Sequence, residues 1–125
     1  MAADTLHIEI EQVKESRLQD VDFDNLVFGR NISDHMFIAD YRDGQWQDLR
    51  VVPYGDLPLS PATAALHYGQ AIFEGMKAYK NEANEVLLFR AKDNWARFNQ
   101  SAERLCMPYI PEEVFMGGLL ELLKL

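Results

Sequence analysis

The chain has few of the residues and patterns that define several protein classes. It contains one cysteine, Cys106, in 125 residues, so no disulfide can form within it. A reducing compartment, and by default the cytoplasm, is therefore expected. No apolar run approaches the ~20 residues that span a bilayer, and no charged and then apolar leader follows Met1. Neither secretion nor a membrane partner is expected.

Basic residues are also scarce. Lysine and arginine number 12 against 20 acidic residues, which gives a net charge of −8. Nucleic-acid binding is not expected, because phosphate neutralisation needs clustered cations. Seven acidic and only two basic residues fall within 1–25, so this segment is predicted to be a solvated lead-in. Hydrophobic residues make up 48% of the chain, enough for one globular domain over 26–125.

The common catalytic signatures are missing too. The three histidines are scattered and the cysteine stands alone, so no metal site is expected. No serine lies in a glycine-flanked elbow, and no glycine-rich loop opens a helix. His35 and His67 are expected to be structural, hydrogen-bonded residues, and Cys106 is expected on the buried side of a helix.

The elements that the sequence does predict form an α+β domain, a mostly antiparallel sheet flanked by helices. Two strands, 35–41 and 46–53, are joined by the turn dipeptide Asp43-Gly44. A second hairpin is predicted from 73–79 and 86–89, with the turn between them. One helix is expected from Asp93, as its N-cap, to the break at Pro108, and another from Pro111 onward. The tandem glycines at 117–118 predict close packing against that last helix.

The second hairpin and the helix after it carry the candidate chemistry. If 73–79 is a strand, its side chains alternate between two faces that both mix polar and apolar groups, as in the wall of a pocket. Gly75 would leave room there for a ligand, and Glu74 would play a structural or supporting part. Arg97 lies on the polar face of the predicted helix with Ser101 and Arg104, and its guanidinium suits a phosphate. From spacing alone, a solvated or ion-paired surface arginine is the alternative.

Several separated blocks of residues resemble one enzyme family. They are Leu26-Val27-Phe28-Gly29, Asp34-His35-Met36-Phe37, His67-Tyr68-Gly69, Phe73-Glu74-Gly75-Met76-Lys77-Ala78-Tyr79, Leu88-Phe89-Arg90, Asn94, Arg97, Ser101-Ala102 and Arg104-Leu105-Cys106-Met107-Pro108. In this order and spacing they resemble the amino-terminal domain of branched-chain amino acid aminotransferases, which are pyridoxal-phosphate enzymes of fold type IV. The resemblance covers about residues 25–125.

The resemblance implies specific roles. Arg97 is expected to contact the phosphate of pyridoxal 5'-phosphate, and Phe28, Tyr68 and Phe73 are expected to line the pocket for the substrate's branched side chain. The reaction implied is transfer of the amino group of leucine, isoleucine or valine to 2-oxoglutarate, in a homodimer. The family's Schiff-base lysine belongs to a second domain, and Lys77 matches no such position. The chain is therefore expected to be an incomplete, inactive part of the enzyme, with no catalytic residue of its own.

Two alternatives remain open from the sequence. One is another fold type IV enzyme, a D-amino-acid aminotransferase or an aminodeoxychorismate lyase. The other is a non-catalytic acidic interaction module that shares only the fold.

Overall fold

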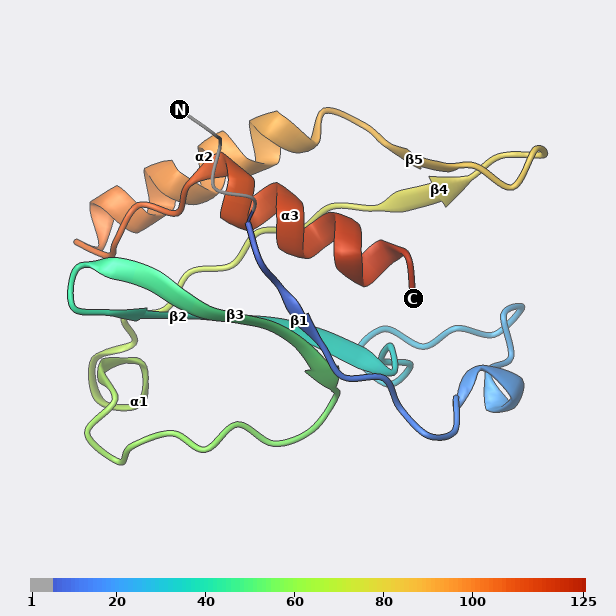
Figure 1. Cartoon of the computed structure of the whole chain (residues 1–125), viewed down its shortest axis with the longest axis horizontal. Helices are drawn as coiled ribbons and strands as arrows, with labels where there is room; N and C mark the ends of the chain where they lie inside the picture. The colour runs from blue at the N-terminus through green and yellow to red at the C-terminus, as the bar shows by residue number, and fades with distance from the viewer. Residues whose placement is uncertain (1–5) are drawn as a thin grey trace. The chain divides into compact units, whose positions relative to one another are not determined.

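The computed structural model describes residues 6–125 and has the α+β class expected from the sequence, with antiparallel strand pairs and helices (Figure 1). The chain divides into two compact units. The first contains residues 6–56 and 118–125, and the second contains Leu57–Gly117.

A three-stranded sheet forms the first unit. β2 (His35–Arg42) and β3 (Gln45–Pro53) pair antiparallel, which confirms the predicted hairpin and its turn. Asp43 and Gly44 both have positive φ, as a tight two-residue connection requires. β1 (Glu9–Ile10) pairs parallel with the other edge of β3, giving the order β1-β3-β2. Val51 of β3, with no exposed surface, is the most buried side chain of this unit.

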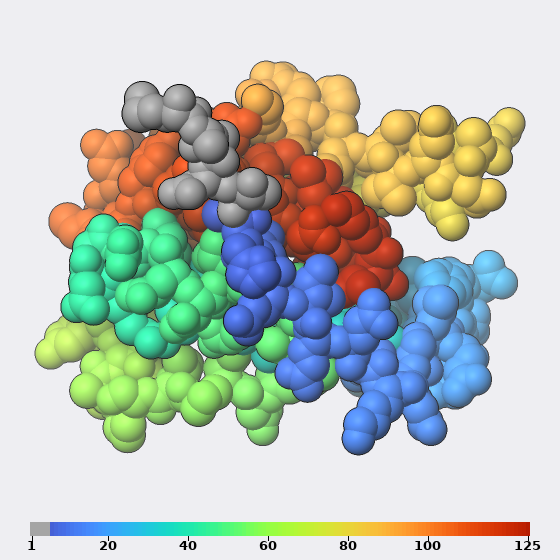
Figure 2. Space-filling model, in the orientation of Figure 1, coloured from blue at the N-terminus to red at the C-terminus, as the bar shows by residue number. Residues whose placement is uncertain are grey.

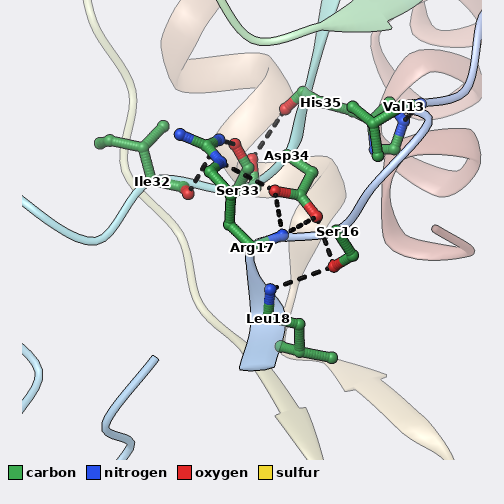
Figure 3. A network of polar contacts seen from close by, with 8 residues as sticks. All are labelled: Val13, Ser16, Arg17, Leu18, Ile32, Ser33, Asp34 and His35. Atoms are coloured by element: carbon green, nitrogen blue, oxygen red, sulfur yellow. Dashed lines mark hydrogen bonds and ion pairs between the residues drawn. The ribbon is translucent and has the colours of Figure 1, made fainter. Parts of the chain in front are cut away.

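The segment before β2 is fastened by side chains (Figure 3). The Asp34 carboxylate accepts hydrogen bonds from Ser16 Oγ at 2.6 Å and from the backbone N–H and Nε of Arg17. Arg17 Nη2 also donates to the carbonyl oxygen of Ser33, at 2.8 Å. The short 3-10 helix η1 (Leu18–Asp20) follows. These bonds tie part of the predicted acidic lead-in to the sheet, and the proposed boundary near residue 25 stays a prediction.

The second unit begins with a helix that the sequence did not predict and a hairpin that is shorter than predicted. α1 (Ala64–Tyr68) ends at Gly69, whose φ of 63° is left-handed. β4 (Ala78–Lys80) pairs antiparallel with β5 (Val86–Leu88). The predicted strand over 73–79 is wrong for most of its length, because residues 71–77 have no regular secondary structure. In Figure 2 this yellow hairpin projects from the orange start of the next helix.

α2 (Ala91–Arg104) is the long helix of the second unit. Its N-cap is Arg90, with φ 53°, and Asp93 lies in the first turn, so the predicted start at Asp93 was wrong. Cys106 is exposed, with φ 54°, which corrects the expected burial of this residue. Its N–H donates to the Glu103 carbonyl, and the Met107 N–H donates to that of Ala102, the pattern of a Schellman helix end.

α3 (Glu112–Leu123) begins directly after Pro111, as predicted. In the first unit, a Cβ built on Gly118 would overlap three ring carbons of Phe37 in β2. This confirms the close packing that the sequence predicted for Gly118. No helix within residues 6–125 has the length and apolarity needed to cross a membrane.

Candidate functional site

The best-defined polar cluster of the second unit joins α2 to the irregular segment 71–77. Asn94 and Arg97 are three residues apart on α2, so their side chains share one face of the helix. Glu74 comes from the irregular segment and meets both of them. The sequence analysis gave Glu74 a structural or supporting part, and the structure identifies its partners.

Glu74 is enclosed by hydrogen-bond donors. Arg97 donates to its carboxylate from Nε, at 2.7 Å, and from Nη2 to the other oxygen, so the contact is bidentate. Asn94 Nδ2 donates to Glu74 Oε1 at 3.1 Å, and the Gly75 backbone N–H donates to the same oxygen at 3.0 Å. Only 6% of the Glu74 side chain is exposed. These donors, Arg97 foremost, lower the pKa of Glu74 from 4.5 to about 2.

Arg97 turns its remaining donors to solvent. Its side chain is 65% exposed, although Glu74 holds one edge of the guanidinium. Within residues 6–125, Nη1 has no hydrogen-bond partner. The carboxylate also raises the pKa of Arg97 above its already high usual value. The result is a permanent cation with a fixed orientation and a free donor edge, which can receive a phosphate or a carboxylate.

The segment that carries Glu74 is held along α2 by side chains, since it has no strand partner. At one end, Gln70 Nε2 donates to the Leu105 carbonyl at 2.8 Å. At the other end, Asn94 Nδ2 donates to the Gly75 carbonyl at 3.1 Å, in addition to its bond to Glu74. Asn94 therefore touches both the side chain of Glu74 and the backbone of the next residue.

Comparison with known proteins gives consistent relatives. No protein-family model matches the chain. The chain is 44% identical over its whole length to branched-chain-amino-acid aminotransferase 2 of Bacillus subtilis (strain 168), covering 34% of that protein. It is 46% identical to a probable branched-chain-amino-acid aminotransferase of Staphylococcus epidermidis, over 88% of the chain and 31% of the relative. A branched-chain-amino-acid aminotransferase of Mycolicibacterium smegmatis is 45% identical over 77% of the chain and 26% of its own length.

Over the length that they share, the chain is similar in sequence to branched-chain aminotransferases. This confirms the resemblance found in the sequence. The chain spans about a third of the length of the curated relatives it matches.

The three aromatic residues that the resemblance assigns to the substrate pocket of an aminotransferase are all exposed. Phe28 lies in the first unit, in the loop before β2, with its side chain fully exposed. In the second unit, Tyr68 is the last residue of α1 and Phe73 directly precedes Glu74, and these residues are 87% and 90% exposed. Their common pocket stays a prediction.

The described cavities do not contain the residues of this candidate site. A groove of about 590 Å³ in the first unit is lined mostly by polar side chains of β2 and β3. Another, of about 500 Å³, lies beside α2 and is lined by residues such as Trp95, Met107 and Tyr109. Neither includes Arg97, Tyr68 or Phe73. Size alone therefore does not identify the site, and the case for Arg97 rests on its oriented charge.

His35 and His67 each have a backbone partner. His67 Nε2 lies 2.6 Å from the carbonyl oxygen of Pro61, and His35 Nε2 accepts the Val13 N–H at 3.0 Å. Both contacts fit the expected structural part. Across residues 6–125, no group of three or more His, Cys, Asp or Glu side chains could hold a metal ion.

Sequence reasoning missed the part that Asn94 plays. It entered the sequence analysis only as one residue of the resemblance. The available signal was its spacing of three residues from Arg97, together with a lone glutamate between Phe73 and Gly75 in an otherwise weakly charged segment. The error in assigning a strand to 73–79 hid this signal, because strand alternation placed Glu74 away from the candidate pocket.

Proposed function

We propose that this chain is the amino-terminal part of a branched-chain amino acid aminotransferase. The whole enzyme would transfer the amino group of leucine, isoleucine or valine to 2-oxoglutarate. The observation that carries the proposal is the 44% identity over the full chain to a branched-chain aminotransferase, combined with one oriented, solvent-facing arginine at a family motif.

The cofactor of the proposal is pyridoxal 5'-phosphate, and the chain offers a group that fits its phosphate. Arg97 is charged at any physiological pH, is held in plane by Glu74, and has Nη1 available. Its bond to Glu74 offsets part of its charge, so orientation rather than raw charge is what it contributes. When bound, the cofactor supplies an electron sink for amino-group transfer.

The substrate specificity of the proposal rests on aromatic side chains. Phe28, Tyr68 and Phe73 are large rings without covering contacts in their own units, as their exposure indicates. Exposed rings of this kind can form part of a binding pocket when a ligand or a further domain covers them. An apolar pocket gains about 0.8 kcal/mol for each methylene it buries, which favours branched aliphatic side chains over smaller or polar ones.

The chain has no lysine at a position that matches the family's Schiff-base lysine. Its five lysines are Lys14, Lys77, Lys80, Lys92 and Lys124, and none matches the family's Schiff-base position. The chain alone is therefore proposed to be inactive. The parent enzyme is proposed to be a homodimer in the cytoplasm, acting on small amino and 2-oxo acids without nucleic-acid or membrane partners.

The test is an assay of the proposed parent protein, in which this chain would be joined to the remaining length of its relatives. With pyridoxal phosphate and 2-oxoglutarate, it should form glutamate from L-leucine and not from D-alanine. The 125-residue chain under the same conditions should form none. Activity with D-alanine alone would instead indicate another fold type IV enzyme. Absence of transamination with every amino acid tested would favour the non-catalytic interaction module.

A further inference from the structure

We propose that Glu74 and Asn94 are positioning residues that hold the phosphate-binding arginine and the substrate-facing Phe73 in one fixed arrangement. The inference rests on the proposed function of Arg97 and deepens it. It concerns two residues that would contact neither the cofactor nor the substrate.

The first support is the way the segment 71–77 is held. It has no strand ladder, so its backbone conformation depends on the side chains that bind it. Glu74 reaches Arg97 and Asn94, and Asn94 also binds the Gly75 carbonyl. Phe73 is directly joined to this anchored pair and is 90% exposed. The backbone next to Phe73 is thus held in place while its ring stays exposed, as expected of a side chain that is positioned to contact a ligand.

The second support is the burial of Glu74. Its carboxylate is almost closed off from solvent and accepts four hydrogen bonds, while its partner Arg97 is largely exposed. An ion pair that served only surface charge balance would leave both groups mobile and solvated. Here the carboxylate is fixed by the helix and by its own backbone, so it sets the plane of the guanidinium.

The third support is the shared donor. Asn94 Nδ2 lies 3.1 Å from Glu74 Oε1 and 3.1 Å from the Gly75 carbonyl oxygen. One amide group thus contacts both the carboxylate that orients Arg97 and the backbone that follows Phe73. Displacement of Asn94 would disturb both sides together, which couples the phosphate end of the site to the side-chain pocket.

If Glu74 positions Arg97, its removal should change the affinity for phosphate in the opposite direction from that expected if Glu74 only neutralises charge. A nearby carboxylate repels a phosphate, so removal of its charge alone should strengthen phosphate binding. If orientation dominates, removal of Glu74 should weaken it, because the guanidinium loses its fixed plane and must be ordered when the ligand binds.

The first experiment uses the 125-residue chain without ligand. Hydrogen exchange of the Arg97 Nε–H and of the Gly75 N–H, which both donate to the Glu74 carboxylate, is measured by NMR for wild type, Glu74→Gln and Asn94→Ala. Exchange should be about tenfold faster or more in both variants. Glu103→Gln is the matched control, since it removes an acidic charge from α2 and the Glu103 side chain has no polar partner within residues 6–125. Unchanged exchange of the Gly75 N–H in Asn94→Ala would contradict the anchoring.

The second experiment uses the parent protein and measures its Kd for pyridoxal phosphate by absorbance. Glu74→Gln should weaken binding about tenfold, the size of one charge-assisted hydrogen bond. Asn94→Ala, which keeps both charges, should weaken it severalfold, and Glu103→Gln should leave it unchanged. Unchanged or tighter binding in both variants would overturn the proposal. If Glu74→Gln does not fold, as judged by circular dichroism, Asn94→Ala decides.

The coupling to Phe73 has its own readout. In Asn94→Ala at saturating cofactor, KM for L-leucine should rise more than KM for L-alanine, because only the branched side chain uses the ring. A purely structural loss would raise both equally, and that result would contradict the coupling. Arg97→Ala distinguishes a failure of the proposed function of Arg97 from a failure of the positioning inference. If it leaves the Kd unchanged, the proposed function of Arg97 fails; if it weakens binding while Glu74→Gln and Asn94→Ala do not, only the positioning inference fails.

Discussion

Substitution of Gly118 by alanine should have two opposite effects on the free energy of unfolding: a gain in helix propensity and a loss from steric overlap. Gly118 lies in α3, where alanine is favoured over glycine by about 1 kcal/mol in an otherwise unconstrained helix. A Cβ at this position would overlap three carbon atoms of the Phe37 ring. Overpacking of this kind costs about 1–3 kcal/mol, and direct overlap with a rigid ring belongs to the upper part of that range. The net effect should be a loss of about 1–2 kcal/mol in the free energy of unfolding.

The same reasoning predicts a reversal of sign. In a Phe37→Ala background the obstructing ring is gone, so Gly118→Ala should stabilise by up to about 1 kcal/mol. The four proteins form a double-mutant cycle, measured by urea denaturation at 25 °C, with a coupling energy of about 2–3 kcal/mol. If Gly118→Ala has the same effect with and without the Phe37 ring, the packing explanation is refuted.

Three further predictions follow from other contacts. Asn99 is buried and exchanges two hydrogen bonds with the backbone of Ile110, so Asn99→Asp, which sets an oxygen against the Ile110 carbonyl, should lower the free energy of unfolding by about 2 kcal/mol or more in urea denaturation; an unchanged midpoint would contradict this. Hydrogen bonds from Ser16 and Arg17 lower the pKa of Asp34 from 3.8 to about 2. The hydrogen bonds between Asp34 and residues 16–17 should therefore be complete above pH 4 and be lost as the pH falls toward 2, which would be seen as faster hydrogen exchange of the Arg17 amide. Asp34→Asn should abolish this pH dependence. Cys106 has a left-handed backbone conformation, so Cys106→Gly should increase the free energy of unfolding by about 1 kcal/mol and raise the thermal midpoint. A lower midpoint would contradict this and would show that packing of the cysteine side chain stabilises the fold.

The elements that the sequence predicted well are those fixed by local chemistry. The hairpin of β2 and β3 follows from two extended, apolar-rich segments on either side of Asp43-Gly44, whose dihedral angles suit a tight turn. α3 follows from Pro111 and two glutamates in the first turn. In these regions the local preferences and the observed structure agree.

The errors lie where side chains at long sequence separation determine the backbone. Residues 71–77 have strand-like composition, but Glu74 binds Arg97, 23 residues away, and no strand pairs with them. α2 begins at Ala91 because Arg90 adopts a left-handed N-cap conformation, which composition does not reveal. Cys106 was expected to be buried because of its residue type. It instead occupies a left-handed helix-end position usually taken by glycine, and it is exposed.

The candidate site was only partly accessible from the sequence. Arg97 could be proposed as a phosphate ligand from the blocks that resemble the family, but its orientation by Glu74 and Asn94 depends on the irregular segment that was predicted as a strand. The pocket role of Phe28, Tyr68 and Phe73 stays a prediction.

The central claim is that Arg97 recognises a phosphate. The most direct measurement compares the affinities of the parent protein for pyridoxal phosphate and for pyridoxal, which lacks the phosphate, in wild type, Arg97→Ala and the control Arg104→Ala. The account predicts that Arg97→Ala weakens pyridoxal phosphate about tenfold or more and leaves pyridoxal unchanged, while Arg104→Ala changes neither. Equal weakening of both ligands, or an unchanged affinity for pyridoxal phosphate, would contradict it.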